Sequence, residues 1–116
     1  MPFSRQAKKL KTMAFDGTEG DQIELATASA WTRNYRNANP GATKGHFFGK
    51  DIINQILNQS GCMGIRIYYA HKDTAGTKEL ILVGAKNTED DMYKAVVADM
   101  STPCPTVCGS SNPLNS

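Results

Sequence analysis

The chain has 116 residues, of which 40% are hydrophobic and 21% are charged, and its formal net charge at pH 7 is +2. This length predicts one domain, since about 100–150 residues is the commonest domain size. No apolar run approaches the roughly 18 residues that a membrane-spanning helix needs, so we expect no membrane span.

The positive charge is concentrated at the N-terminus. Four basic residues fall in the first eleven positions: Arg5, Lys8, Lys9 and Lys11. No apolar stretch of about 7–15 residues follows them, so the sequence as written predicts no secretory signal and a cytoplasmic protein. We predict a flexible basic arm over residues 1–20 and a single α+β domain over residues 21–116. The arm has few aromatic side chains for base stacking, so nucleic acid is not an expected partner.

Two segments before residue 60 space their apolar side chains by three and four residues, which is typical of amphipathic helices. The first helix is predicted to begin within residues 21–24 and to end near Asn37, because Pro40 follows soon after. The second is predicted from residues 46–48 to Asn58.

The next segment predicts a β-hairpin with strands at about residues 62–71 and 78–86 and a turn-rich loop between them. The second strand holds a continuous apolar run, Leu80 to Val83, which predicts a central strand covered on both faces. Alternation assigns one face of the first strand to the core. That face holds Met63, Ile65, Ile67 and Tyr69, and the other holds Cys62, Gly64, Arg66, Tyr68 and Ala70.

The segment after the hairpin is ambiguous. Residues 94–100 fit a third antiparallel strand, which the hairpin needs as a neighbour. Alternatively, Thr88 caps a helix with acidic residues in its first turn. We predict an α+β fold with two N-terminal helices packed on a small antiparallel sheet and a cysteine-containing tail. An exposed edge of such a sheet invites pairing, so a homodimer is one expected state.

Four short blocks occur in a fixed order: WTRNYR at residues 31–36, KGHFFGK at 44–50, GCMGIRIYYA at 61–70 and PCPTVC at 103–108. With these blocks the chain resembles a group of small uncharacterised bacterial proteins over about residues 22–116. That group has no known activity, so the resemblance implies no catalytic or binding residues. It supports the domain boundary and little else.

The chain has three cysteines, Cys62, Cys104 and Cys108, and this odd number fits a reducing compartment better than a fully paired secreted framework. One interpretation is a zinc site formed by all three with His46 or His71 as the fourth ligand. The alternative is a disulfide or redox pair between Cys104 and Cys108, for which a structural bridge or two ordinary thiols is the better prediction. We expect no cofactor, with zinc as the alternative.

A cysteine nucleophile would need Cys62 and a histidine in hydrogen-bonding contact. His71 lies at the far end of the same predicted strand, roughly 30 Å away at about 3.3 Å per residue. His46 begins the helix that ends before Cys62, roughly 20 Å along its axis. Neither placement suits catalysis.

A polar binding pocket is the remaining candidate site. Arg66 on a strand must snorkel, pair with a carboxylate such as Asp51 or Glu79, or bind a ligand anion. The predicted binding residues are Trp31, Tyr35, Arg36, Lys44, His46, Arg66 and Tyr68. We therefore expect a non-catalytic binding or protein-interaction module whose partner is a small molecule or another protein. The alternative is a small thiol-dependent or zinc-binding protein that uses Cys62, Cys104 and Cys108.

Overall fold

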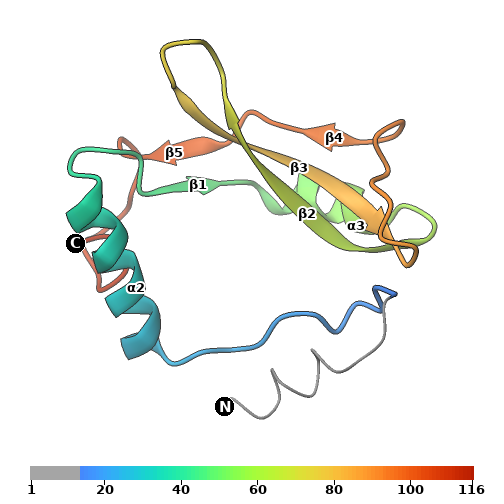
Figure 1. Cartoon of the computed structure of the whole chain (residues 1–116), viewed down its shortest axis with the longest axis horizontal. Coiled ribbons are helices and arrows are strands. Elements are labelled where there is room, and N and C mark those ends of the chain that lie inside the picture. The colour runs from blue at the N-terminus through green and yellow to red at the C-terminus, as the bar shows by residue number, and fades with distance from the viewer. Residues whose placement is uncertain (1–13) are drawn as a thin grey trace.

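The computed structural model of the chain describes residues 14–116, so most of the predicted basic arm, with its four basic residues, lies outside the described residues. Within these residues, two helices and five strands follow in chain order (Figure 1). They are α2 (Leu25–Ala38), β1 (Gly45–Phe47), α3 (Lys50–Leu57), β2 (Cys62–His71), β3 (Lys78–Lys86), β4 (Val97–Ala98) and β5 (Thr102–Cys104). This order confirms the predicted α+β class. Among the described residues, no helix has the length and apolar character needed to cross a bilayer.

The predicted hairpin is confirmed as β2 and β3, which pair antiparallel from His71 opposite Lys78 down to Gly64 opposite Ala85. The loop between them is closed by a backbone hydrogen bond of 2.8 Å from the Lys72 N–H to the Thr77 carbonyl. The Asp73 carboxylate also accepts hydrogen bonds from the backbone N–H and the hydroxyl of Thr77. These local contacts fix the register of the hairpin.

Strand β3 is the centre of the sheet, whose order is β2-β3-β4. Its residues Leu82 to Ala85 are all buried, which confirms the cover on both faces that the continuous apolar run predicts. On one face Leu82 packs in a core cluster with Ile56 of α3 and Ala98 of β4. The close approach of α3 depends on Gly84, where an added Cβ would lie 2.9 Å from the Cys62 sulfur and 3.3 Å from Ile56 Cγ2.

The predicted face pattern of β2 is wrong at both ends. The β2–β3 register shifts between Cys62 and Gly64, so Cys62 joins the residues packed on the core and Met63 is exposed. Ile65 packs on the core as predicted. Ile67 is 53% exposed and Tyr69 is 93% exposed, so neither joins the core as predicted, because both lie towards the loop end of the hairpin and only Ile65 of that face packs on the core cluster. A bulge moves one residue to the opposite face, and simple alternation cannot foresee it.

The third strand exists but is short. β4 pairs Val97 with Val83 and Ala98 with Leu82, and so occupies only part of the predicted residues 94–100. Met100 ends it, because its φ of 64° is in the left-handed region. The alternative helix after Thr88 is wrong. That segment is irregular, and its Met92 N–H donates to the Gly84 carbonyl at 2.8 Å.

The start of the second helix was predicted too early, because residues 45–47 form β1. This strand pairs antiparallel with β5 near the C-terminus, Gly45 opposite Cys104, in a two-stranded ribbon that the sequence analysis did not predict. Strands of three residues give almost no period to detect.

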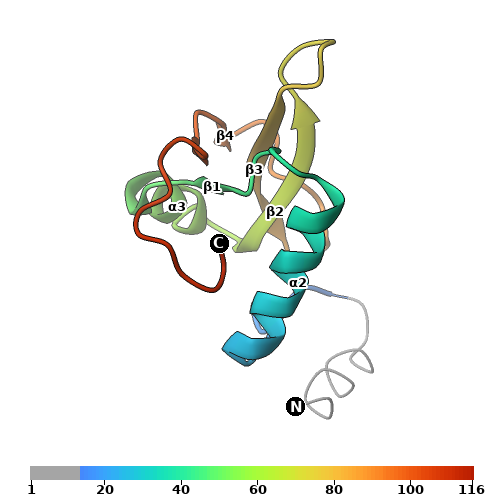
Figure 2. The same cartoon turned by 90° about the vertical axis from the view of Figure 1, so that its left-hand side faces the viewer.

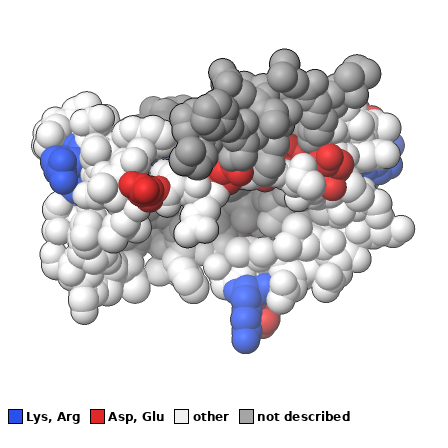
Figure 3. All heavy atoms as spheres, turned by 90° about the horizontal axis from the view of Figure 1, so that it is seen from below, with Lys and Arg blue, Asp and Glu red and all other residues white. Residues whose placement is uncertain are grey.

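The two helices differ in what they cover. α3 packs on β2 and β3 as predicted. α2 packs instead on the C-terminal tail, where the Ser29 hydroxyl donates to the Pro113 carbonyl and Arg36 donates to the carbonyls of Leu114 and Ser116. Figures 1 and 2 show α2 well apart from α3. Seen from below, the described surface carries few charged side chains (Figure 3).

Candidate functional site

Arg66 lies in a network that ties β2 to the β3–β4 connection. Its Nη1 atom is 2.5 Å from Asp91 Oδ1 and 3.0 Å from the Glu89 carbonyl oxygen. The Tyr68 hydroxyl donates to the other carboxylate oxygen of Asp91. The guanidinium carbon also lies 5.2 Å from the centre of the Phe15 ring, so residue 15 of the predicted arm is anchored here.

This network shifts the pKa of each member. The hydrogen bond from Tyr68, and then that from Arg66, lowers the pKa of Asp91. The same bond raises the pKa of Tyr68, because losing the hydroxyl proton would place a second negative charge beside the carboxylate. The ion-pair partner of Arg66 is therefore Asp91, and the alternatives Asp51 and Glu79 were wrong.

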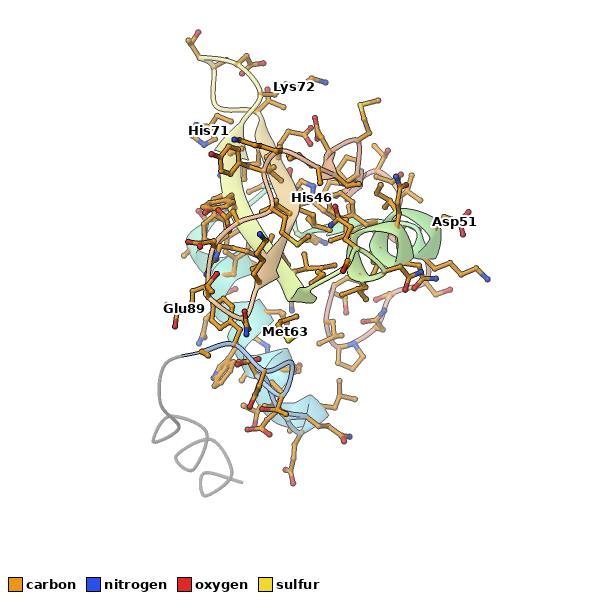
Figure 4. The ribbon with its side chains drawn as sticks, turned by 90° about the vertical axis from the view of Figure 1, so that its right-hand side faces the viewer. His46, Asp51, Met63, His71, Lys72 and Glu89 are labelled. Atoms are coloured by element: carbon orange, nitrogen blue, oxygen red, sulfur yellow. A yellow bond between two sulfur atoms is a disulfide. The ribbon has the colours of Figure 1, made fainter. Side chains whose placement is uncertain are left out.

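A cavity of about 660 Å³, which we call the large cavity, lies between the α2–β1 connection and the loop end of the hairpin. Three chain segments supply its walls: the end of α2 with residues 43–46, the end of β2, and the start of β3. Its lining residues are Tyr35, Thr43, Lys44, Gly45, His46, Tyr69, Ala70, His71, Lys78, Glu79 and Leu80. Figure 4 shows His71 near the hairpin tip, whereas Met63 and Glu89 lie at the opposite end of the sheet.

Two of the basic residues in this cavity are held in place by hydrogen bonds. Lys44 Nζ donates to the Asn115 carbonyl at 2.7 Å, and the Lys44 N–H donates to the Cys104 carbonyl at 2.5 Å. His46 Nδ1 lies 2.8 Å from the Ser101 hydroxyl. The tail and β5 thus position one wall of the cavity.

The acidic group in this cavity is Glu79. Its Oε1 atom is buried and has no hydrogen-bonding partner among residues 14–116. A buried, unsatisfied oxygen of this kind is destabilising. Two lysines, Lys44 and Lys78, and two histidines, His46 and His71, line the same cavity. The two lysines alone outnumber its one carboxylate.

The seven predicted binding residues do not form one site. Tyr35, Lys44 and His46 line the large cavity. A smaller cavity of about 190 Å³ is lined by Trp31, Thr32, Tyr35, Arg36, Lys44 and Leu114. Arg66 and Tyr68 lie apart from both cavities, in the Asp91 network.

Sequence reasoning missed the hairpin's share of the large cavity, namely Tyr69, His71, Lys78, Glu79 and Leu80. It also missed Ser101 beside His46. The pairing of β1 with β5 lies next to the contact between His46 and Ser101, and no local pattern announces that pairing. The one available signal was the position of His71 and Lys78, opposite each other where the hairpin loop begins.

The cysteines separate into a bridge and a free thiol. Cys104 and Cys108 form a disulfide with a Cα–Cα distance of 4.8 Å, which is one of the two states that the sequence favoured, the other being two ordinary thiols. Cys62 is free, and its sulfur donates to the Gly64 carbonyl at 3.2 Å. Within residues 14–116, no three His, Cys, Asp or Glu side chains are grouped to hold a metal ion.

Comparisons with known proteins found no matching family model, no matching curated protein and no matching solved structure.

Proposed function

We propose that the chain is a non-catalytic binding module that holds a small organic anion in the large cavity. The observation that carries this proposal is the convergence of Lys44, His46, His71 and Lys78 on a cavity with one carboxylate. Lysine ammonium and histidine N–H groups donate hydrogen bonds to carboxylate or phosphate oxygens, and the charge-assisted bonds of lysine are among the stronger ones in proteins.

The size and walls of the cavity support a ligand with an apolar part. A volume of about 660 Å³ falls within the range of small-molecule pockets, which are typically about 300–1,000 Å³. Tyr35, Tyr69 and Leu80 supply apolar surface beside the basic groups. An aromatic or aliphatic acid, or a phosphate ester of similar size, has this combination of charge and apolar surface.

The absence of turnover is part of the proposal. His46 contacts the Ser101 hydroxyl, but within residues 14–116 no hydrogen-bonded carboxylate orients the imidazole as a nucleophile–base pair requires. We infer that Ser101 positions His46 for binding.

The thiol or zinc alternative has less support, since the disulfide occupies two of the three cysteines. The cytoplasmic location remains a prediction, and a structural disulfide favours an oxidising environment instead.

The test is a titration with defined anions. Calorimetry with inorganic phosphate, phenyl phosphate and benzoate separates the contribution of the charge from that of the ring. We expect the two aromatic anions to bind and to raise Tm. We expect Lys78→Gln and His71→Gln each to weaken binding about tenfold, which corresponds to about 1.4 kcal/mol.

The matched control is Lys50→Gln. This variant removes the same charge from an exposed position on α3, outside the large cavity. It should bind like the unmodified chain. If no anion binds below about 10 mM, or if all three variants bind equally, the cavity is not an anion site.

A further inference from the structure

Strand β2 is an edge strand of ten residues, because within residues 14–116 the order β2-β3-β4 leaves one side of it without a strand neighbour. In an antiparallel ladder, alternate residues point their N–H and C=O groups away from the neighbouring strand. The Gly84 carbonyl accepts from the Met92 N–H and therefore points away from β2. Its opposite residue, Ile65, must then point its own backbone groups outward.

The same alternation assigns Ile67 and Tyr69 to the outer edge. The loop end of the hairpin gives the same result. The Lys72 N–H points towards β3, because it donates to the Thr77 carbonyl, so every second residue before it, down to Arg66, also points its backbone groups towards β3. The residues between them point theirs outward. Among the described residues, no hydrogen bond reaches the backbone groups of Ile65, Ile67 or Tyr69 outside the ladder. These three residues present a row of unpaired donors and acceptors, which is a template for another strand.

The side chains beside this edge are apolar and accessible. Ile67 is 53% exposed, Tyr68 is 45% exposed and Tyr69 is 93% exposed. The N-terminal segment passes below β2 in Figure 1, and its residues 16–24 are exposed. That segment approaches the start of β2, where a Cβ on Gly17 would lie 3.4 Å from the Met63 carbonyl oxygen. Phe15, Gly17 and Glu19 also line a cavity of about 330 Å³ together with Met63 to Arg66, so the part of the edge clear of this segment is Ile67 to Tyr69.

We propose that a second copy of the chain pairs with this edge, antiparallel, about a two-fold axis that passes through Ile67. Ile67 then lies opposite its own copy, and Ile65 lies opposite Tyr69 on the same face. On the other face, Arg66 lies opposite Tyr68 of the second copy. Aliphatic–aromatic pairs of this kind are favourable across strands.

Charge favours this register over its neighbours. An axis through Arg66 would place two guanidinium groups opposite each other, and like charges directly opposite are destabilising. An axis through Tyr68 would bring together two tyrosines that each hold an Asp91 carboxylate. With the axis at Ile67, each Arg66 lies opposite the uncharged Tyr68 of the second copy, so no like charges are brought together.

The area available predicts a weak dimer. Tyrosine buries about 150–250 Å², so covering the exposed parts of Tyr68 and Tyr69 removes roughly 300 Å² from each copy before the backbone is counted. Stable interfaces bury about 800 Å² per partner, and smaller ones are transient. We therefore expect a dissociation constant in the micromolar range.

The first test measures mass in solution by light scattering from about 5 μM to 500 μM. We expect the mass to rise from one chain of 12.6 kDa towards twice that value. Ile67→Pro should weaken association at least tenfold and leave the hairpin folded, because the N–H that proline lacks makes no bond to β3. Ile67→Lys tests the same edge without a change of backbone.

The second test reads the register by oxidation of single cysteines in a Cys62→Ser background. Ile67→Cys places two sulfurs at the axis, within the Cα range of about 4.4–6.8 Å that a disulfide allows. Tyr69→Cys is the matched control, since its two copies would lie about 14 Å apart along the strands. We expect a covalent dimer from the first variant alone.

Three results would overturn the proposal. They are a monomer at every concentration, a dimer that both Ile67→Pro and Ile67→Lys leave unchanged, and a covalent dimer that forms as readily through Tyr69→Cys. Ile67 does not line the large cavity, so the Ile67 variants test the strand edge separately from anion binding.

Discussion

Arg66 on β2 and Asp91 before β4 meet at 2.5 Å although 25 positions separate them in the chain. Their contact, with the hydrogen bond from Tyr68, holds the β3–β4 connection against the first strand of the hairpin. Because β4 is only two residues long, it depends on this anchor as well as on its own ladder.

The first prediction concerns this anchor. Asp91→Asn removes the ion pair and leaves the Arg66 guanidinium without its carboxylate partner. We expect Tm to fall by a few degrees and hydrogen exchange to accelerate in residues 87–92. The control is Asp99→Asn, which removes an exposed carboxylate and should leave both measurements unchanged. Equal effects in the two variants would show that net charge, and not the anchor, is responsible.

The second prediction is the pH dependence of stability. The folded-state pKa of Asp91 is lowered. Its contribution to the free energy of unfolding is therefore complete above the ordinary aspartate pKa of about 4 and is lost as pH falls through the folded-state pKa. The folded-state pKa of Tyr68 is raised. Its contribution to the free energy of unfolding is therefore complete below the ordinary tyrosine pKa of about 10 and is lost as pH rises through the folded-state pKa. Chemical denaturation from pH 2 to 12 should therefore show a plateau from about pH 5 to 9.

Asp91→Asn supplies the control for this profile. It removes the titrating carboxylate and the acceptor for Tyr68, so both flanks of the plateau should become shallower. An unchanged profile would mean that other groups set the pH dependence.

The third prediction tests how closely α3 packs on β3. Gly84→Ala places a methyl group 2.9 Å from the Cys62 sulfur and 3.0 Å from Gln59 Nε2. We expect a loss of about 1–3 kcal/mol in the free energy of unfolding, as is typical of overpacked cores. Gly64→Ala is the control, because a Cβ there has no other atom within 4 Å. Adding Cys62→Ala should recover part of the loss, which a double-mutant cycle measures as a coupling energy.

The fourth prediction concerns the disulfide. Replacing Cys104 and Cys108 by serine removes a bridge that closes a very short loop, for which chain entropy predicts a loss of about 2 kcal/mol. The effect should be local, because the bridge adjoins β5 and β5 pairs only with β1. We expect faster hydrogen exchange in residues 45–47 and in α2, and unchanged protection in the β2–β3 ladder. Uniform acceleration would contradict this division.

The sequence was informative wherever structure is local. The hairpin, the burial of β3 and the position of α3 follow from periodicity and turn residues within a few positions. The register shift after Cys62 and the left-handed backbone at Met100 could not be predicted in this way, because neither residue type demands it.

The candidate site was only partly predictable for the same reason. Tyr35, Lys44 and His46 were identified by residue type, but the cavity also needs His71 and Lys78 from the hairpin. Those segments are distant in the chain and meet only in the tertiary structure. Arg66 was recognised as needing a partner, and Asp91 was missed because charge alone could not rank it above nearer carboxylates.

The short loop at residues 72–77 also bears on how the chain folds. Joining β2 to β3 closes a small loop at low entropic cost, whereas joining β1 to β5 closes most of the described chain. Local pairing generally forms first in such a topology. We therefore expect substitutions in the hairpin to slow folding, and substitutions in β5 mainly to speed unfolding. The ribbon that completes the cavity would then assemble last and open first.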